Sequence, residues 1–511
     1  MLGRRRVSSR GARSHAPKWS VRVNTQLVVS SAALVLVLAA CGDDKGVNEP
    51  PASPVVSGFS VAANTNNVLS AIASLTATNT DSARVVYWTN GGAQEHTPFT
   101  TSVSGQGSGT AGHITVLGLR PATDYSFAVE AVNTHGTVTS DTTTFTTGAL
   151  PAFLQSASIT SAAPSSGGYI LTSLYDGSTA YATAFDSAGR VAWYRAFPGG
   201  KPIGELKQQT NGNITAAIST SHGGEQVEGN AVSISPDGTV VRTYSAPAGS
   251  YFDVHEFWEL SDIEGAYAGA VFFAYTARHL DLSSTGGPSD SLVTGHQVVK
   301  QDASGSQTVL FDAWDHFAIT NNVEPVLGQL DFDHPNALTF APDGNYIVSW
   351  RNLDAITKID ANTGALIWTL ASPLGNLASD FTIASDPLNG FSAQHSVRSL
   401  ANGDLLIFDN GTRHATQRSR AVEYSLDTSA HTATLMWSYT HAPAYWTAFT
   451  GSVERYQNGN TLIGWTFGTP LVATEVTSAG ATVWEGTLQV TGAQVPYRFI
   501  KIVSLYGYQQ P

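Results

Sequence analysis

Cysteine, charged residues and long hydrophobic runs are all scarce in this sequence, and each shortage narrows what the chain can be. Cys41 is the single cysteine among 511 residues, so no disulfide framework can form and the fold must be stabilised by packing. Charged residues make up only 13% of the chain and the formal net charge is −13, which is not the composition of a basic, nucleic-acid-binding surface. We therefore expect no nucleic-acid partner.

The N-terminal segment is predicted to be a targeting signal. Residues 1–26 hold seven basic side chains and no acidic one, and the uncharged run 27–40 that follows is too short to span a bilayer of about 30 Å as a helix. The run ends in LAACG at 38–42, which resembles the lipobox of bacterial lipoproteins, where the cysteine is lipidated. We expect a lipoprotein signal peptide at 1–40, a lipidated Cys41 with a tether at 41–54, and a protein exported and lipid-anchored in the bacterial cell envelope, as a periplasmic or outer-membrane lipoprotein.

The abundant residues favour an all-β protein. The chain holds 48 glycines, 10% aromatic residues and 42% hydrophobic residues, a balance that suits strands joined by many turns. Short alternating segments between 55 and 148 predict a β-sandwich. The stretch GLRPATDY at 118–125 and the closing FTT at 145–147 resemble a fibronectin type III module, with Tyr125 as its corner tyrosine. Such a module implies spacing or docking rather than chemistry.

Two sequence units repeat over residues 151–511. One is a glycine turn that enters an apolar strand, at Gly212, Gly344, Gly403 and Gly459. The other ends in tryptophan, at Trp193, Trp368 and Trp484, with a looser copy at Trp437. Successive turns lie 59 and 56 residues apart between Gly344 and Gly459, which gives about six periods of four strands each. We predict a six-bladed β-propeller over 151–511; seven or eight shorter blades remain the alternative, because the copies before residue 330 are eroded.

Four polar residues in this region stand out by their local context: His255, His334, Arg351 and His395. His334 lies ten residues before Gly344, and His395 lies eight residues before Gly403. The two histidines therefore occupy nearly equivalent places in successive blades, and equivalent places in a propeller converge on its central channel.

The same region resembles the arylsulfotransferase family, bacterial enzymes that move a sulfuryl group between phenols without a nucleotide sulfate donor. The match rests on HPN at 334–336, SWRN at 349–352, ITKID at 356–360, QH at 394–395, FDNG at 408–411 and PYR at 496–498. It is strong over about 330–510 and weaker over 151–330. Family members also carry an N-terminal β-sandwich before the propeller, which agrees with the predicted two-part layout.

The resemblance implies a ping-pong transfer of a sulfuryl group from an aryl sulfate to a phenol. His395 takes the place of the family's nucleophile and would form a sulfohistidine. Arg351 would hold the sulfuryl oxygens, and His334 would protonate the leaving phenolate and deprotonate the incoming phenol. The expected substrate-binding residues are His255, Asn336 and Thr466. No metal and no cofactor is required, the expected partners are phenolic sulfate donors and phenol acceptors, and the family allows a homodimer.

Three alternatives stay open from the residues alone. The glycine-to-tryptophan units also resemble those of quinone-dependent dehydrogenases, although no acidic cluster with calcium-site spacing is evident. His255, His334 and His395 could form a zinc site. A non-catalytic, lipid-anchored propeller that serves as a binding platform is the third, because the pocket lacks the disulfide that family members place nearby. We assign the other propeller histidines to packing or surface, and Arg413, Arg418 and Arg420 to a solvated loop that could rim the pocket; those histidines are His222, His279, His296, His316, His414, His431 and His441.

Overall fold

The computed structural model describes residues 52–103, 109–220, 228–262, 265–325, 328–491 and 496–509. The predicted signal peptide, Cys41 and most of the tether lie outside the described residues. In the described part, no helix is long and apolar enough to cross a membrane. The helical elements there are short: η1 (Ala152–Ser156), η2 (Ser283–Thr285), α1 (Ala313–His316), η3 (Ile319–Asn321) and η4 (Arg351–Leu353).

Two sheets form a β-sandwich at the start of the described chain. One sheet has the order β1 (Val55–Ala63), β2 (Ala71–Thr78), β5 (Thr110–Val116). The other contains β4 (Glu95–His96), β3 (Ser82–Trp88), β6 (Asp124–Asn133) and β7 (Gly136–Thr139), with β8 (Thr143–Thr146) also paired to β6. The Tyr125 hydroxyl accepts a hydrogen bond from the Arg120 backbone N–H at 2.9 Å, an arrangement typical of a tyrosine corner.

Apart from three short strands, the described strands that follow the sandwich form six blades of four strands each, which follow one another around a ring. From the first strand of each blade to the fourth, the first three blades are β35 (Ile500–Ile502), β10 (Tyr169–Tyr175), β11 (Thr179–Phe185), β12 (Val191–Pro198); β13 (Ile203–Gln208), β14 (Ile214–Ser219), β15 (Glu228–Ile234), β16 (Val240–Tyr244); and β17 (Tyr251–Ser261), β18 (Tyr267–Leu280), β19 (Ser291–Asp302), β20 (Gln307–Asp312). The last three are β22 (Pro335–Phe340), β23 (Tyr346–Trp350), β24 (Ala355–Ile359), β25 (Leu366–Ala371); β27 (His395–Ser399), β28 (Leu405–Asp409), β29 (Arg420–Asp427), β30 (Thr432–Tyr439); and β31 (Ser452–Arg455), β32 (Thr461–Trp465), β33 (Leu471–Val476), β34 (Thr482–Gln489). The chain is therefore all-β, a sandwich followed by a six-bladed propeller, as predicted.

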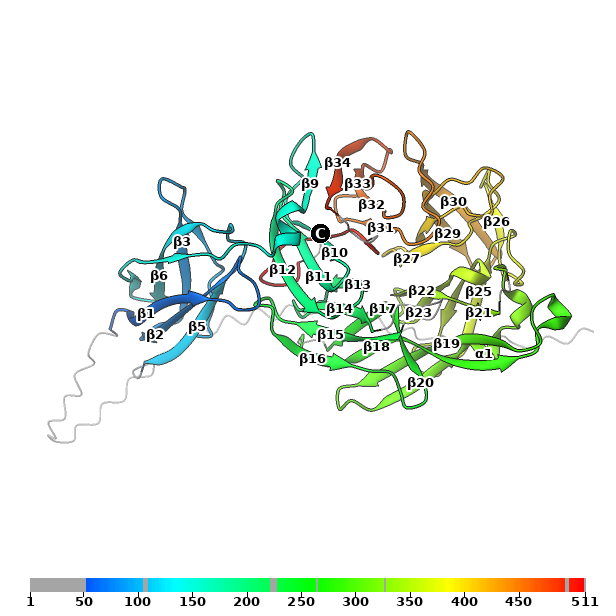
Figure 1. The fold of residues 1–511 in the computed structure, drawn as a ribbon, viewed down its shortest axis with the longest axis horizontal. Coiled ribbons are helices and arrows are strands. Elements are labelled where there is room, and N and C mark those ends of the chain that lie inside the picture. Colours follow the sequence, from blue (N-terminus) through cyan, green and yellow to red (C-terminus); the bar gives the residue numbers. More distant parts are fainter. Residues whose placement is uncertain are drawn as a thin grey trace, which may run out of the picture. The chain divides into compact units, whose positions relative to one another are not determined.

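Both ends of the propeller segment close the ring. The C-terminal β35 pairs with β10 as the first strand of the first blade, and the early β9 (Ser158–Ser161) pairs with β34 in the sixth blade. In Figure 1 the colours run in order around the ring, and the cyan β9 lies beside the red β34. Two short strands, β21 (Gln329–Asp331) and β26 (Thr382–Ala384), pair in parallel with β19 and β30.

The two repeating units of the sequence occupy fixed places in the blades. The glycine turns at Gly212, Gly344, Gly403 and Gly459 each join the first two strands of a blade, and each glycine has a φ between 83° and 90°. That left-handed conformation is strained for any residue with a Cβ, which explains why glycine recurs there. The tryptophan units join the third strand to the fourth. The spacing of the two units thus reports the blade, and one period of the repeat corresponds to four strands.

Apolar side chains fill the gaps between neighbouring blades. Six clusters of buried residues occupy the six gaps. Of the repeat tryptophans, Trp193 and Trp484 are buried, while Trp368 and Trp437 are half-buried against the clusters beside their blades. They pack the blades, as predicted. The first strands of the second to sixth blades contact one another in succession from β13 through β31, and β10 of the first blade contacts β13. These first strands therefore line the centre of the ring, and their starts meet at one end of the channel.

Candidate active site

The predicted site residues lie where the first strands of the blades begin. His255 lies within β17, His334 directly precedes β22, and His395 is the first residue of β27. Arg351 begins η4 after β23, and Thr466 follows β32. The similar offsets of His334 and His395 from their glycine turns therefore correspond to equivalent positions in the fourth and fifth blades.

Ring contacts through one tyrosine connect the three histidines. The ring centroids of His255 and His334 are 4.6 Å apart in an edge-to-face arrangement. Tyr497, just before β35, has its ring 5.6 Å from His255 and 6.4 Å from His395. Its hydroxyl donates a hydrogen bond to the backbone carbonyl of Asn336 at 3.1 Å. Residues from the third, fourth, fifth and first blades thus meet at this end of the channel.

Two of the histidines are paired with carboxylates. The Nδ1 atom of His255 lies 2.9 Å from Asp253, and the Nδ1 atom of His334 lies 2.5 Å from Asp331. Burial alone would raise the pKa of Asp253, but the imidazoles of His255 and His296 outweigh it and hold this pKa far below its usual range. Burial lowers the pKa of His334, although Asp331 opposes that shift. Each ring therefore presents Nε2 away from its carboxylate.

A fourth histidine, His296, lies close to both of these carboxylates. Its Nδ1 lies 2.5 Å from Asp333 and 3.6 Å from Asp331, and its Nε2 lies 3.6 Å from Asp253. Burial would lower the pKa of His296, but Asp333 and Asp331 raise it well above its ordinary value, which favours the protonated ring. The assignment of His296 to packing or surface did not anticipate this link to both histidine–carboxylate pairs.

Among the described residues, His296 and its two nearest carboxylates form a group that could hold a metal ion. Ligand atoms of His296, Asp331 and Asp333 lie within 4.8 Å of one another, and all three residues are buried. Their atoms are already engaged, because Asp333 accepts from both the ring and the backbone N–H of His296. The zinc alternative requires a different trio of rings, and among the described residues those three do not form such a group of ligands.

His395 has surroundings unlike those of the other two rings. It is 2% exposed, and its Nδ1 lies 2.8 Å from Oδ1 of Asn410 and 3.0 Å from the carbonyl of Ala393. Its Nε2 lies 3.1 Å from the backbone nitrogen of Thr450, which can only donate. The hydrogen must therefore sit on Nδ1 and the lone pair on Nε2. Burial, followed by the Arg351 charge, lowers the pKa of His395 well below its ordinary value, so the ring is neutral.

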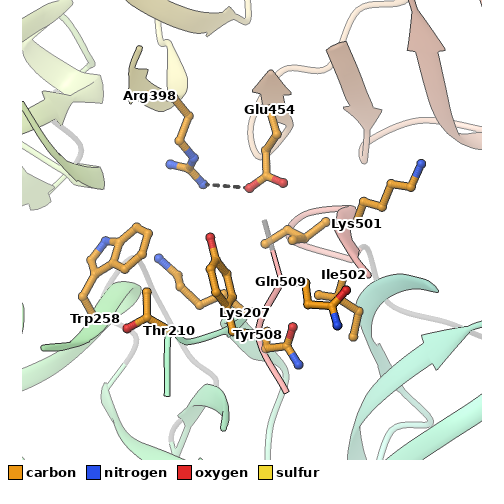
Figure 2. Close-up of a pocket in the computed structure, with 11 residues that line it drawn as sticks. Lys207, Thr210, Trp258, Arg398, Glu454, Lys501, Ile502, Tyr508 and Gln509 are labelled. Atoms are coloured by element: carbon orange, nitrogen blue, oxygen red, sulfur yellow. Dashed lines mark ion pairs between the residues drawn. The ribbon is translucent and has the colours of Figure 1, made fainter. Parts of the chain in front are cut away.

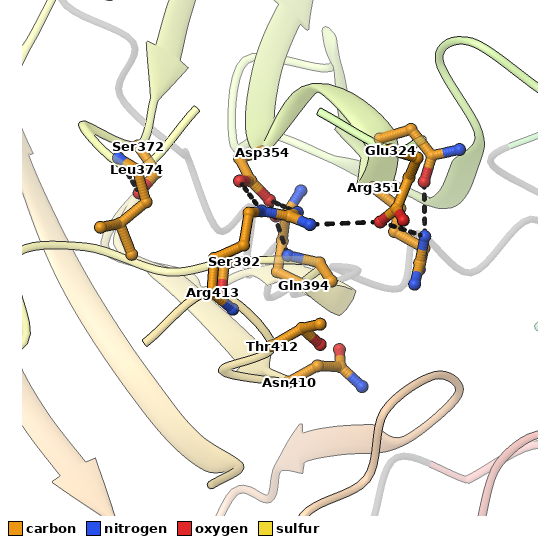
Figure 3. A network of polar contacts seen from close by, with 12 residues as sticks. Glu324, Arg351, Asp354, Ser372, Leu374, Ser392, Gln394, Asn410, Thr412 and Arg413 are labelled. Atoms are coloured by element: carbon orange, nitrogen blue, oxygen red, sulfur yellow. Dashed lines mark hydrogen bonds and ion pairs between the residues drawn. The ribbon is translucent and has the colours of Figure 1, made fainter. Parts of the chain in front are cut away.

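Arg351 belongs to a network of charges at the pocket wall. Its Nη1 lies 3.0 Å from Glu324, and the same carboxylate oxygen lies 3.1 Å from Nη1 of Arg413. Arg413 in turn holds Asp354 through two guanidinium nitrogens, and Figure 3 shows this chain of contacts. Burial would raise the pKa of Glu324, but the two arginines outweigh it and lower that pKa. Glu324 is thus an anion bound to the guanidinium predicted to hold sulfuryl oxygens.

The solvated-loop assignment was wrong for two arginines. Arg413 bridges Asp354 and Glu324 beside the site. Arg420 is 3% exposed and pairs with Asp386 and Asp409, both at 2.8 Å. Carboxylates from distant segments hold these guanidinium groups, which a turn-rich sequence does not reveal.

The two remaining candidates are buried in the same neighbourhood. The Asn336 amide donates to the carbonyl of Gln394 at 2.6 Å, and among the described residues its Oδ1 has no hydrogen-bond partner. The Thr466 hydroxyl lies 2.8 Å from the hydroxyl of Thr450, the residue whose amide meets His395. A pocket of about 340 Å³ opens over part of the site and is lined by Glu324, Pro325, Leu330, Asp331, His334, Arg351 and Asn352.

One family model and several solved structures match this chain. The family model of arylsulfotransferase (ASST) matches residues 160–491, which contain all six candidate residues. No curated protein matches the chain. Similar solved structures include a protein of unknown function from Bacteroides caccae, with 16% identity and a TM-score of 0.40 over 65% of this chain and 98% of that one. Another is virginiamycin B lyase from Staphylococcus aureus, with 10% identity and a TM-score of 0.31 over 73% of this chain and 94% of that one. A third is the periplasmic gluconolactonase of Pseudomonas aeruginosa, with 12% identity and a TM-score of 0.35 over 65% of this chain and 99% of that one.

Proposed function

The chain belongs to the arylsulfotransferase family, and we propose that it moves a sulfuryl group from an aryl sulfate to a phenol through a sulfohistidine at His395. The observation that supports this most is the state of His395: a buried, neutral ring whose lone pair is on Nε2. A neutral imidazole is a good nucleophile, whereas a protonated one is not.

In the first half-reaction, the Nε2 lone pair forms a bond to sulfur while the bond from sulfur to the aryl oxygen breaks. The bonding pair leaves with the phenolate oxygen, and the hydrogen stays on Nδ1. Before the reaction, Nε2 accepts a hydrogen bond from the backbone N–H of Thr450. Once the Nε2 lone pair bonds to sulfur, that N–H is free to donate to a sulfuryl oxygen. In the second half-reaction an acceptor phenol oxygen forms a bond to sulfur, and the pair returns to Nε2.

The surrounding residues supply charge and a proton. Sulfuryl transfer passes through a loose transition state, so positioning and charge stabilisation account for most of the catalysis. Arg351 would bind the sulfuryl oxygens through its planar fork, with His255, Asn336 and Thr466 as further contacts. His334, held by Asp331, would give its proton to the departing phenolate and take one from the incoming phenol.

We also propose that this enzyme is exported and tethered to the cell envelope through Cys41. The support is the basic stretch at 1–26, the uncharged run at 27–40 and the lipobox-like ending. Metabolic labelling with a fatty-acid analogue tests it. Label on the wild type that is lost in Cys41→Ser is expected, and equal labelling of both would contradict it.

A turnover assay tests the enzymatic proposal. The full chain is mixed with a chromogenic aryl sulfate and phenol, without nucleotide or added metal, beside His395→Ala. We expect phenolate release that depends on the acceptor and falls at least about 1,000-fold in the variant, because the nucleophile is gone. His431→Ala, at an exposed ring outside the site, is the matched control. Substantial turnover by a folded His395→Ala variant would remove His395 as the nucleophile, and no release by the wild type would favour a binding platform.

A further inference from the structure

Asn410 connects the ring of His395 to the segment that carries Thr450. It follows β28, the strand paired with β27, and its side chain is buried. Its Oδ1 lies 2.8 Å from Nδ1 of His395. Its Nδ2 donates to two backbone carbonyls, that of Thr447 at 2.6 Å and that of Thr450 at 3.0 Å. Figure 3 shows Asn410 at the edge of the network that contains Arg351 and Arg413.

The orientation of this amide is determined by its partners. Both carbonyls can only accept, so the nitrogen of Asn410 must face them and the oxygen must face His395. An acceptor facing Nδ1 requires the hydrogen there and leaves the lone pair on Nε2. The amide N–H of Thr450 requires the same tautomer from the opposite side of the ring. Two independent contacts thus select one tautomer.

The partner of His395 differs in charge from the partners of the other two rings. His255 and His334 each have a carboxylate at Nδ1, whereas His395 has a neutral amide. A carboxylate would stabilise a proton on the ring and favour imidazolium. The amide supplies the same orientation without that charge, so burial and the Arg351 charge still hold the pKa of His395 low and the ring stays nucleophilic.

The difference also matters for the intermediate. With sulfur on Nε2 and hydrogen on Nδ1, the ring is cationic, so it can leave as a neutral imidazole when the acceptor attacks sulfur. A carboxylate at Nδ1 could remove that hydrogen, and the leaving group would then be imidazolate, which is far poorer. An amide oxygen cannot take the proton, so the transfer potential of the sulfuryl group is preserved.

We propose that Asn410 is a positioning residue that fixes the reactive tautomer of His395 and, because it is uncharged, keeps the sulfohistidine reactive toward the acceptor. This inference rests on the proposed function. The titratable and charged groups that face His395 are Arg351 from η4, His334 before β22, His255 in β17 and Tyr497 before β35. Among these groups the only permanent charge is that of Arg351, so a carboxylate placed at Asn410 would be the nearest anion to the ring.

The test compares Asn410→Asp and Asn410→Ala in the full chain. Asn458→Asp is the matched control, because it adds the same charge at an exposed turn and keeps an acceptor for the N–H of Asn460. The burst of phenolate on mixing with aryl sulfate alone, the mass of the sulfo-enzyme, its decay on adding phenol and the pH profile are measured.

In Asn410→Asp we expect the acid limb of the pH profile to move to higher pH and the sulfo-enzyme to decay at least about 10-fold more slowly with phenol. In Asn410→Ala we expect both half-reactions to slow by about 10- to 100-fold with little change in donor KM, since the Ala393 carbonyl still accepts from Nδ1. A purely structural role would lower the melting temperature and leave the pH profile and the decay rate unchanged, which would overturn the inference.

The two proposals fail in different ways. If the wild type shows no burst and no sulfo-enzyme, or if His395→Ala keeps its turnover, the proposed function is wrong. If the wild type forms a sulfo-enzyme and Asn410→Asp matches its pH profile and decay rate, only the role of Asn410 is wrong.

Discussion

The two ends of the central channel differ in what their polar residues do, although the same strands line both. At the starts of the first strands lie the histidine rings. A few residues further along lie Trp258, Arg398 and Glu454, which line a second, smaller pocket of about 120 Å³ (Figure 2). At the second end, charges face opposite charges. At the first end, a buried ring keeps a lone pair that meets only a backbone amide.

A layer of ion pairs between blades includes Lys207, which lines the second pocket. Lys207 lies 3.1 Å from Glu205 and also contacts Glu256, while Arg498 contacts both glutamates. These side chains come from the first strands of the second and third blades and from the segment before β35. Burial of each charge is offset by neighbours of opposite sign, so this layer joins blades. The comparison indicates that one end of each strand stabilises the ring and the other end carries the candidate chemistry.

The largest expected effect is on the free energy of unfolding, and it comes from removing one carboxylate charge from the layer of ion pairs. Glu256 is fully buried, and although burial would raise its pKa, Arg498 and Lys207 outweigh that and lower it. Glu256→Gln leaves two buried cations with one carboxylate fewer, and we expect a loss of about 3–5 kcal/mol in the free energy of unfolding. Chemical denaturation measures it.

A variant that breaks an exposed ion pair serves as the comparison for the loss of stability. Asp343→Asn breaks an exposed pair with Lys358 at 2.6 Å and should cost less than about 1 kcal/mol. Equal stabilities for Glu256→Gln and Asp343→Asn would contradict the assignment of the buried layer as the joint between blades.

At the end of the channel that holds the histidines, replacing a glutamate by glutamine should alter substrate binding more than stability. Glu324 occupies Arg351 with a carboxylate and lines the pocket that an anionic aryl sulfate must enter. Glu324→Gln removes this competing charge, while Arg413 keeps Asp354 as its partner. We expect the KM for the donor to fall by about threefold to tenfold, with the difference shrinking at high salt.

Steady-state kinetics at two ionic strengths measure this, with Glu130→Gln in the sandwich as the control for loss of an ion-paired carboxylate. A higher KM in Glu324→Gln would mean that Glu324 orients Arg351 for the donor rather than competing with it.

The sequence repeat predicted the ring of blades well because each repeat is marked by short local motifs, above all the glycine turns. The turns at Gly344 and Gly403 are set by backbone conformation, so their spacing is visible in the sequence and places His334 and His395 in equivalent registers. The acids Asp253 and Asp331 lie only two and three residues before their histidines, and that spacing is the signal that could have identified them.

Other parts of the site depend on contacts between distant segments. His296 reaches Asp331 because β21 pairs in parallel with β19, a contact that neither strand's own pattern indicates. The partner of Nε2 in His395 is the backbone amide of Thr450, and every residue but proline has one, so no residue type marks it. Arg413 and Arg420 are paired with carboxylates that come from other turns.

The smallest expected effect concerns a long ion pair in the second pocket. Glu454 and Arg398 lie 3.8 Å apart, and Figure 2 shows the two side chains pointing at each other across the pocket. Burial raises the pKa of Glu454, and the nearby cations, Arg398 first among them, only partly oppose that shift.

A carboxyl group whose pKa is higher in the folded state than in the unfolded state binds protons more tightly when folded. Its ionisation therefore costs stability as the pH rises from the unfolded pKa through the folded one. We expect Glu454→Gln, which cannot ionise, to be more stable than the wild type by less than about 1 kcal/mol at pH 7. The difference should shrink as the pH falls from the raised folded pKa to the unfolded pKa of about 4.3, and it should vanish below that pH, where the wild-type group is protonated in both states. Denaturation at several pH values measures this, and a variant less stable than the wild type at neutral pH would mean that the pair with Arg398, rather than burial, determines the contribution of Glu454.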